Sequence, residues 1–295
     1  MKSLVPSLAI VVLNAALFTG CNAPQFSATR DFEKVIPINS QVDVNVQTFN
    51  GSINVTPSAE SEITLVAHAK AYGNTQAEAE TALESLVPQI DTTTTAINIE
   101  CKKRNQLSSW SDSVSLELKV PANWPLHLTT SNGSVLTSQS RGPVTIKTSN
   151  GKIDVKEAAG SLQLTTSNGK ITIENSAGNM QASSSNGTVR LIDCVLEGKS
   201  KLQTSNGAIS VNLSERSPIQ LDASTSNGSI KFNEADIDVA KKSKSHLSGV
   251  LFGNASGTSP NASLELVTSN GSITIMMDVD ALPSRRTPME AVTIQ

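Results

Sequence analysis

The sequence repeats one short phrase eight times, and this repeat constrains the fold more than any other feature. In its commonest form the phrase reads Thr-Ser-Asn-Gly, followed by a small or basic residue and then Ile or Val. The Asn-Gly pairs are Asn50-Gly51, Asn132-Gly133, Asn150-Gly151, Asn168-Gly169, Asn186-Gly187, Asn206-Gly207, Asn227-Gly228 and Asn270-Gly271. From Asn132 onward the spacings are 18, 18, 18, 20, 21 and 43 residues, the last being close to two periods. A fixed period near this length is typical of repeat proteins, in which each unit buries its apolar face on its neighbours.

Apolar and polar residues alternate on both sides of each Asn-Gly pair. Around Asn150, for example, Val144 and Ile146 precede the pair, and Ile153 and Val155 follow it. This alternation has the period of a β-strand. A glycine lies eight residues before several of the asparagines, at Gly142, Gly160, Gly178 and Gly198. Each unit is therefore predicted to be a strand, an Asn-Gly corner, a second strand and a glycine corner.

Two architectures fit this unit. Asn-Gly between alternating strands is also a strong hairpin signal, because both residues tolerate positive φ, so a long antiparallel meander is an alternative. The recurring Thr-Ser before the pair favours a parallel β-solenoid, since identical polar side chains at one register can form hydrogen-bonded ladders between stacked coils. We therefore expect an all-β, β-helix-like parallel solenoid built from repeats of 18–21 residues.

The N-terminus has the features of a lipoprotein signal peptide, predicted over residues 1–20. Lys2 precedes a mostly apolar stretch that is too short to span a membrane, and Phe18-Thr19-Gly20-Cys21 resembles a bacterial lipobox. That resemblance implies that Cys21 carries an acyl anchor such as palmitate and that 21–30 is a lipidated linker. Asn22, in place of Asp, favours the outer membrane if the cell has two membranes. An ordinary signal peptide is the alternative.

The composition disfavours several classes of partner. The chain has 23 Lys+Arg and 26 Asp+Glu, and removing Lys2 with the signal peptide changes the net charge from −3 to −4. This mild acidity gives no reason to expect nucleic acid as a partner. Aromatic residues make up only 3% of the chain, which argues against aromatic-lined sugar platforms. Cys101 and Cys194 are predicted to be separately buried thiols, with a disulfide between them as the alternative.

The rest of the chain divides around the regular repeats. Residues 31–125 are expected to form a less regular N-terminal β part, and 126–280 the repeat region, with a loop insertion near 234–262. Residues 281–295 are expected to be a loosely held tail. Thr75-Gln76-Ala77-Glu78 resembles a capping box and predicts one short helix near 75–87. Its inward residues would be Ala82, Leu83 and Leu86, and it would cover the open end of the solenoid.

The whole pattern resembles a known family. It comprises Asn50-Gly51-Ser52-Ile53, the helix near 75–87, a strand ending at Val120-Pro121 and the serial Thr-Ser-Asn-Gly units. These features resemble the "putative adhesin" domains of bacterial envelope proteins, a family of unknown function, over about residues 31–279. The resemblance implies a β-solenoid and brings no catalytic residue. Some relatives act as sensors or inhibitors in envelope-stress systems.

Motifs for chemistry are scarce. His68, His127 and His246 are far apart in sequence and form no paired metal motif, and neither a Walker loop nor a nucleophile elbow is present. We therefore predict no catalytic residue, no metal and no cofactor. Aligning the repeats places some charged residues side by side on the outer surface: Lys156 with Glu174, Lys152 with Lys170, and Asp154, Thr172 and Arg190 in one column.

These observations favour a non-enzymatic, lipid-anchored protein of the cell envelope. Its solenoid would present a rigid surface for adhesion or for an envelope protein or glycan partner. One alternative is an envelope-stress sensing or regulatory lipoprotein. A second alternative is a carbohydrate-active β-helix enzyme that uses Asp154, Glu174 or Arg190. The Asn-Gly pairs are expected to be structural corners, with a hydrogen-bonding ridge for glycan as the alternative.

Overall fold

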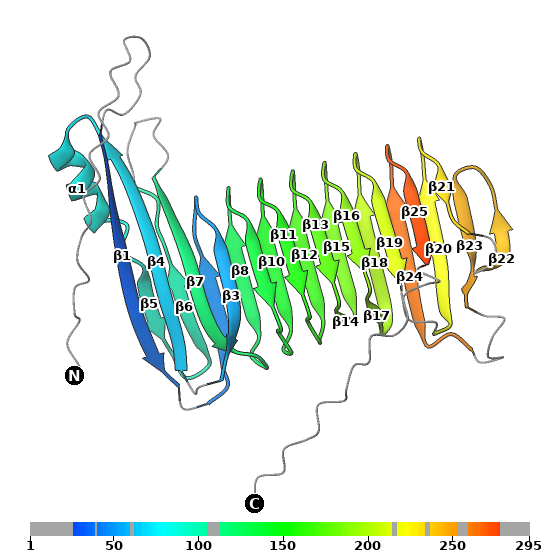
Figure 1. Cartoon of the computed structure of the whole chain (residues 1–295), viewed down its shortest axis with the longest axis horizontal. Coiled ribbons are helices and arrows are strands. Elements are labelled where there is room, and N and C mark those ends of the chain that lie inside the picture. Colours follow the sequence, from blue (N-terminus) through cyan, green and yellow to red (C-terminus); the bar gives the residue numbers. More distant parts are fainter. Residues whose placement is uncertain are drawn as a thin grey trace, which may run out of the picture.

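The computed structural model describes residues 26–38, 40–59, 62–104, 112–213, 217–233, 237–252 and 259–277. The predicted signal peptide, Cys21 and the tail 281–295 lie outside these residues. The described chain forms a long rod in which two β-sheets face each other (Figure 1). The described residues therefore form an all-β, β-solenoid-like fold with long parallel sheets and one short helix.

The two sheets are named here sheet A and sheet B. In spatial order, sheet A contains β1 (Phe26–Pro37), β4 (Glu62–Gly73), β7 (Ser113–Pro121), β3 (Ile53–Ser58), β9 (Val135–Ser138), β11 (Ile153–Lys156), β13 (Ile171–Glu174), β16 (Val189–Ile192), β19 (Ile209–Leu213), β25 (Ile273–Met277) and β21 (Ile230–Lys231). Sheet B contains β22 (Ile237–Lys242), β23 (His246–Leu251), β20 (Ile219–Thr225), β24 (Ala262–Thr268), β18 (Gly198–Thr204), β15 (Met180–Ser184), β12 (Leu162–Thr166), β10 (Val144–Thr148), β8 (Leu126–Thr130), β2 (Asp43–Gln47), β6 (Ala96–Glu100) and β5 (Gln89–Thr92). A short parallel pair, β14 (Ala177–Gly178) with β17 (Val195–Leu196), lies at the second corner.

The strands of the regular region pair in parallel, which excludes the antiparallel meander there. Val144 of β10 lies opposite Leu126 of β8 on one side and Leu162 of β12 on the other, and the three strands share this parallel register. In sheet A, Ile153 of β11 lies opposite Ile171 of β13 in the same way. One coil therefore consists of a strand of sheet B, an Asn-Gly corner, a strand of sheet A and a second corner.

The core is the space between the two sheets. Residues that alternate along each strand point inward and are buried, among them Val144, Ile146, Ile153 and Val155. Burying an aliphatic side chain of this size contributes about 1.5–3 kcal/mol, and each coil adds several of them. Because the coils are in register, the inward side chains stack on their counterparts in the next coil and form one continuous apolar core.

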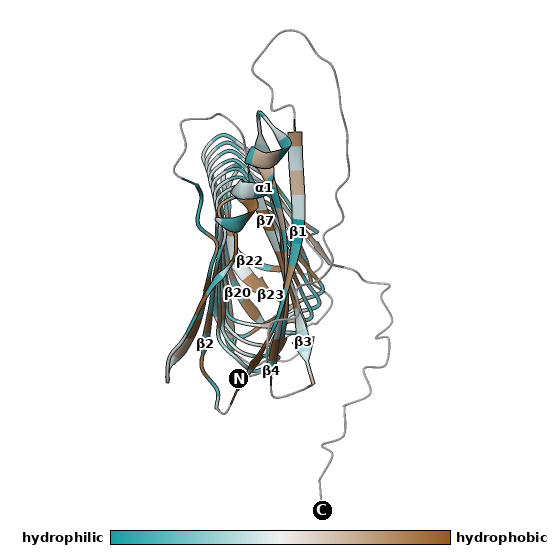
Figure 2. Ribbon diagram, turned by 90° about the vertical axis from the view of Figure 1, so that its left-hand side faces the viewer, coloured by the Kyte–Doolittle hydropathy of each residue, from teal (hydrophilic) through white to brown (hydrophobic). Residues whose placement is uncertain are grey.

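Helix α1 (Gln76–Glu84) lies at the N-terminal end of the rod, where it packs on β1 and β4. Thr75 caps it, because its Oγ1 accepts a hydrogen bond from the Glu78 backbone N–H at 3.1 Å. The residues predicted to face inward, Ala82, Leu83 and Leu86, are all buried. Figure 2 views the rod from this end and shows α1 at the opening between the two sheets.

Two expected boundaries differ from the structure. Phe26–Arg30, placed in the linker 21–30 from sequence, form the first part of β1 and pair with the far end of the long strand β4. The loop insertion expected near 234–262 contains β22 and β23, an antiparallel hairpin that extends sheet B from β20. Strand β22 resembles a loop in sequence because only Ile237 of this edge strand is buried, so it lacks the alternation of apolar residues that marks the other strands.

The coils do not stack in the order of the sequence. Strand β24, from the last coil of the chain, lies between β18 and β20 and pairs in parallel with both (Figure 1). At the other end, β3 lies between β7, which follows it in sequence, and β9. Near each end of the rod, the order of the strands in the sheets therefore differs from their order in the sequence.

Candidate functional site

The eight motif asparagines lie in one row along the edge of the rod, called here the Asn ladder. Seven of the eight donate from the side-chain Nδ2 to the Oδ1 of the asparagine in the neighbouring coil, and Asn50 is the acceptor at the end of the row. The bonds are Asn132 to Asn50 at 2.5 Å, Asn150 to Asn132 at 2.6 Å, Asn168 to Asn150 at 2.7 Å, Asn186 to Asn168 at 2.7 Å, Asn206 to Asn186 at 2.8 Å, Asn270 to Asn206 at 2.7 Å and Asn227 to Asn270 at 2.8 Å. All except the half-buried Asn50 are exposed. The ladder thus joins residues that are far apart in sequence.

The Thr or Ser two residues before each asparagine bonds to backbone groups of the corner rather than to the Asn ladder. Thr166 Oγ1 donates to the Gly151 carbonyl of the neighbouring coil at 3.1 Å and accepts from the Gly169 N–H of its own corner at 3.1 Å. Ser184 makes the equivalent pair of bonds. These hydroxyls are buried, so they satisfy corner backbone groups that water cannot reach.

The motif glycines other than Gly51, whose φ is 149°, are required for space rather than for backbone conformation. A Cβ on Gly169 would lie 1.7 Å from the Gly151 carbonyl oxygen, far inside van der Waals contact. From the sequence, the Asn-Gly pairs were expected to be corners because Asn and Gly tolerate positive φ. This reason is wrong for the corner at Gly169, because neither Asn168 nor Gly169 has positive φ. Positive φ occurs instead at the second corner, in a separate 18-residue series: Gln139, Glu157, Asn175 and Asp193, with φ of 50–56°.

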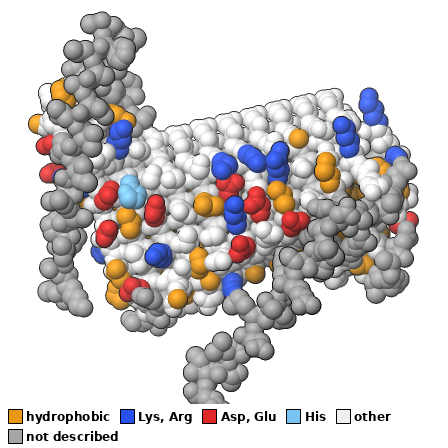
Figure 3. Space-filling model, in the orientation of Figure 1, with side chains coloured by type: hydrophobic (Ala, Val, Ile, Leu, Met, Phe, Trp, Pro, Cys, Tyr) orange, Lys and Arg blue, Asp and Glu red, His pale blue; other side chains and the backbone are white. Residues whose placement is uncertain are grey.

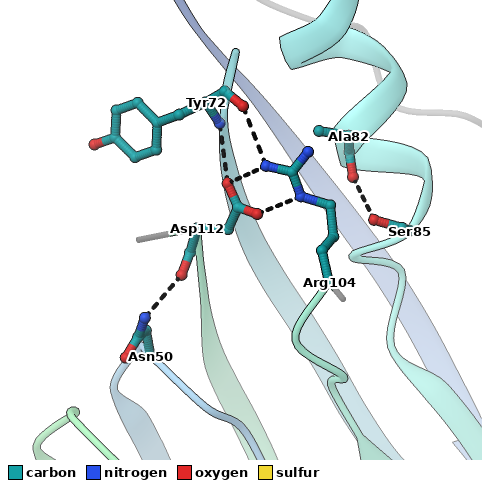
Figure 4. Close-up of polar contacts among 6 residues, drawn as sticks. All are labelled: Asn50, Tyr72, Ala82, Ser85, Arg104 and Asp112. Carbon is teal, nitrogen blue, oxygen red and sulfur yellow. Dashed lines mark hydrogen bonds and ion pairs between the residues drawn. The ribbon is translucent and has the colours of Figure 1, made fainter. Parts of the chain in front are cut away.

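A buried ion pair lies at the N-terminal end of the Asn ladder (Figure 4). The Asp112 carboxylate accepts from Arg104 Nε at 2.5 Å, from Arg104 Nη2 at 2.8 Å and from the Tyr72 backbone N–H at 3.0 Å. The Asp112 carbonyl accepts from Asn50 Nδ2 at 3.1 Å, which joins the cluster to the ladder. This cluster was not predicted from the sequence, because Arg104 and Asp112 flank a polar stretch that carries no motif.

Acidic and basic side chains gather near the middle of the rod on the face drawn in Figure 3, and several of them lie on sheet A. Lys156 Nζ lies 3.2 Å from Glu174 Oε2, the attractive pair expected from the alignment of repeats. Thr172 pairs in register with Asp154 on one side and Arg190 on the other, as expected. Lys152, directly before β11, has its Nζ 2.5 Å from Oδ2 of Asp154 in the same coil.

The histidines do not come together. His68 Nδ1 is 2.9 Å from Asp31 Oδ1 on the outside of sheet A, whereas His127 and His246 lie on sheet B. Within the described ranges, the structure has no group of three or more His, Cys, Asp or Glu residues placed to hold a metal ion. No helix in the part of the chain that the structure describes is long and apolar enough to cross a membrane.

Cys101 and Cys194 are separately buried and form no disulfide with each other, as predicted from the sequence. Burial raises the pKa of the Cys101 thiol to about 12, against the opposing effect of a hydrogen bond with Thr48. Cys194 lies at the second corner, where its Sγ contacts the Ile192 carbonyl at 3.2 Å. A thiol with so high a pKa is almost entirely protonated at neutral pH and is a poor nucleophile.

The chain matches one family model and is similar to several solved structures. The family model described as Toastrack DUF4097 matches residues 25–276. A "putative cell adhesion protein" from Clostridium sporogenes is 11% identical, with 85% of this chain and 100% of that chain covered and a TM-score of 0.37. A "putative adhesin" from Parabacteroides distasonis is 10% identical, covering 84% and 97%, with a TM-score of 0.43. A "putative lipid binding protein" from the same species is 12% identical, covering 83% and 96%, with a TM-score of 0.38.

No curated protein matches the chain. The family match runs from just before β1 to within β25, and therefore includes the Asn ladder, both sheets and helix α1. It agrees with the resemblance inferred from the Asn-Gly repeats, the helix and the strand ending at Val120-Pro121. The chain belongs to the Toastrack DUF4097 family, a family of unknown function.

Proposed function

We propose that this protein is a non-enzymatic, lipid-anchored protein of the cell envelope that presents its solenoid as a rigid surface for adhesion or partner binding. The observation that carries the proposal is the outer face of sheet A. There the parallel register holds outward side chains in straight columns along the rod, as in the column of Asp154, Thr172 and Arg190. Such a face suits an extended partner better than a small substrate.

The rigidity of this face has a structural basis. The Asn ladder and the buried hydroxyls of the Thr-Ser-Asn-Gly motif link every coil to the next at the corner, in addition to the backbone hydrogen bonds of the sheets. Ordered side chains lose little further entropy on binding, and this loss is one of the main costs of association.

The proposed membrane attachment depends on Cys21, which the lipobox-like sequence marks for lipidation. Strand β1 begins five residues later, at Phe26, and lies at the N-terminal end of the rod (Figure 1). A lipid on Cys21 would hold this end near the membrane, with the outer membrane favoured by Asn22, and leave the faces of the sheets open to an envelope protein or glycan.

The carbohydrate-active enzyme is less well supported by the geometry. Glycoside hydrolysis needs two carboxyl groups free to act on one bond. Asp154 is in contact with Lys152 at 2.5 Å, and Glu174 with Lys156 at 3.2 Å. Both candidate carboxylates are thus occupied in ion pairs on an open sheet face.

The proposal can be tested by cross-linking the lipidated protein in its own cells, purifying it and identifying bound material by mass spectrometry. A Cys21→Ala variant, exported without the lipid, is the matched control. We expect the wild-type protein in the membrane fraction, with a reproducible protein or glycan partner that the control recovers less well. An unchanged membrane fraction for Cys21→Ala would contradict lipid anchoring, and turnover of a glycan would contradict the non-enzymatic role. Recovery of an envelope-stress regulator would favour the sensor alternative.

A further inference from the structure

Three neighbouring strands form a charged patch on the outer face of sheet A, called here the β11–β13–β16 patch. Alternation along each strand places every second side chain on this face. The outward residues are Lys152, Asp154 and Lys156 in the first coil, Lys170, Thr172 and Glu174 in the second, and Thr188, Arg190 and Ile192 in the third. The patch therefore has four basic and two acidic side chains.

The ion pairs in this patch leave two positive charges uncompensated. Asp154 is engaged by Lys152, and Glu174 by Lys156. Lys170 and Arg190 make no ion pair with any acid in the described parts of the chain. These two side chains lie in adjacent coils and flank Thr172, since Lys170 is two residues before it and Arg190 of β16 is its cross-strand partner.

Thr172 supplies the second observation. Its side chain points to the outer face, yet the residue is only 4% exposed, because it is a short side chain between the longer Asp154 and Arg190. Its Oγ1 is buried and has no hydrogen-bond partner. A buried hydroxyl without a partner is unfavourable in the unliganded protein, and an acceptor that reached it would relieve this cost.

We propose that Lys170, Thr172 and Arg190 bind an anionic group of an acidic polysaccharide. The group is a carboxylate or a sulfate, whose oxygens accept hydrogen bonds from the Arg190 guanidinium, the Lys170 ammonium and the Thr172 hydroxyl. Hydrogen bonds between charged groups are the strongest in proteins, and the planar fork of arginine matches such anions. This inference rests on the proposed function, in which the outer face of sheet A binds a partner.

A polysaccharide fits this site better than a small anion for two reasons. Successive strands are about 4.8 Å apart, so the patch and the coils beside it form a straight track along the rod. The Asn ladder runs along the same edge, and exposed Asn168 is separated from Lys170 only by Gly169, so sugar hydroxyls can pair with amides next to the charges. With aromatic residues at 3% of the chain, neutral sugars have few rings to stack on, which favours an anionic polymer.

The test measures binding of the full chain, kept in detergent, to immobilised polymers at low ionic strength. The probes are polygalacturonate for carboxylate, dextran sulfate for sulfate, and unmodified dextran as the neutral polymer, with inorganic sulfate as a competitor. The variants are Lys170→Ala with Arg190→Ala, and Thr172→Val, which keeps the shape and the β-branch but removes the hydroxyl. Lys147→Ala is the matched control, because Lys147 is an exposed lysine on β10 of the opposite sheet.

We expect wild type to bind at least one charged polymer and not dextran, with an affinity that falls as salt rises. The double variant should weaken binding about tenfold or more, because it loses two charged contacts to the anion. Thr172→Val should weaken binding about threefold, because it loses one contact. Lys147→Ala should bind as wild type does. The polymer that binds more tightly identifies the anionic group.

Several outcomes would overturn the inference. Equal losses of affinity for Lys147→Ala and the double variant would show that the polymer is attracted by charge alone. An unchanged affinity of Thr172→Val would show that the Thr172 hydroxyl does not contact the anion. Full competition by inorganic sulfate at equal concentration would show a small-anion site. If wild type binds neither charged polymer while cross-linking still recovers an envelope partner, the anionic-glycan site fails and the proposed function stands.

Discussion

Asn270 donates a side-chain hydrogen bond of 2.7 Å to Asn206, a residue 64 positions earlier in the chain. Asn227, which lies between them in sequence, is displaced one coil outward and bonds to Asn270 instead. The 43-residue spacing before the last motif therefore does not mark a skipped coil at the end of the row. It marks a hairpin, β22–β23, followed by a return of the chain into the stack.

We expect Gly169→Ala to destabilise the protein by about 3 kcal/mol or more, because the new methyl would overlap the Gly151 carbonyl and force two coils apart. The measurement is thermal and urea unfolding followed by far-UV circular dichroism. Ser167→Ala, at an exposed position of the same corner, is the control and should change stability by less than about 0.5 kcal/mol. Equal stability of Gly169→Ala and wild type would show that neighbouring coils can accommodate a methyl group at this corner.

The buried hydroxyls of the repeats allow a paired comparison. Thr166→Val removes two hydrogen bonds from corner backbone groups and should cost about 1–3 kcal/mol. Thr172→Val removes a hydroxyl that has no partner, so without ligand it should be neutral or slightly stabilising. Urea unfolding of both variants tests this difference, and a larger loss for Thr172→Val than for Thr166→Val would contradict it.

The position of an asparagine in the Asn ladder should determine how much its side chain contributes to the free energy of unfolding. Asn168→Ala removes two side-chain bonds, one to Asn150 and one from Asn186, whereas Asn227→Ala removes one. At about 0.5–1.5 kcal/mol for each bond, Asn168→Ala should cost about twice as much as Asn227→Ala. Chemical denaturation of the two variants under identical conditions gives the comparison. A smaller effect for Asn168→Ala would argue that the exposed ladder adds little to stability.

Alkaline pH should weaken the fold through Cys101. Its pKa is about 12 in the folded protein and 9.0 as the ordinary value, so between these pH values the unfolded thiol loses its proton while the folded one keeps it. The unfolded state then binds fewer protons, so the free energy of unfolding falls as pH rises from about 9 and is unaffected by this group below that. We expect a loss of a few kcal/mol by pH 12 that is absent in Cys101→Ala. Parallel pH dependences for the two proteins would be inconsistent with this assignment.

The repeat itself was predictable because it follows from elementary periodicity. Alternation around Val144, Ile146, Ile153 and Val155 identifies strands and their inward faces, and the recurrence of the whole phrase at 18 residues favours stacking in parallel. The capping pattern at Thr75 likewise predicted the only short helix among the described residues. Each of these signals is local, or repeats at a constant interval, so it can be read along the chain.

The features that could not be predicted depend on contacts between distant segments. Nothing near Ala262 indicates that β24 inserts between β18 and β20, because all three strands carry the same register and would fit any neighbour. The Arg104–Asp112 pair and the unpaired Thr172 hydroxyl are equally invisible in sequence, since both depend on which side chains the fold places around them. Asn175 and Asp193, residue types that tolerate positive φ, were the available signal for the second corner.

The Asn ladder has a direction. Every amide in it donates toward the N-terminal end of the rod, from Asn227 through to Asn50, and the last donor ends on the Asp112 carbonyl. Aligned amide dipoles polarise one another, so the row behaves as a single extended dipole rather than as separate bonds. At one end of the row the terminal group is the Oδ1 acceptor of Asn227. At the other end the terminal group is the Nδ2 donor of Asn50, which is covered by the Arg104–Asp112 cluster. The two ends of the rod therefore differ in polarity, and a molecule that extended the row past Asn227 would have to do so with a hydrogen-bond donor.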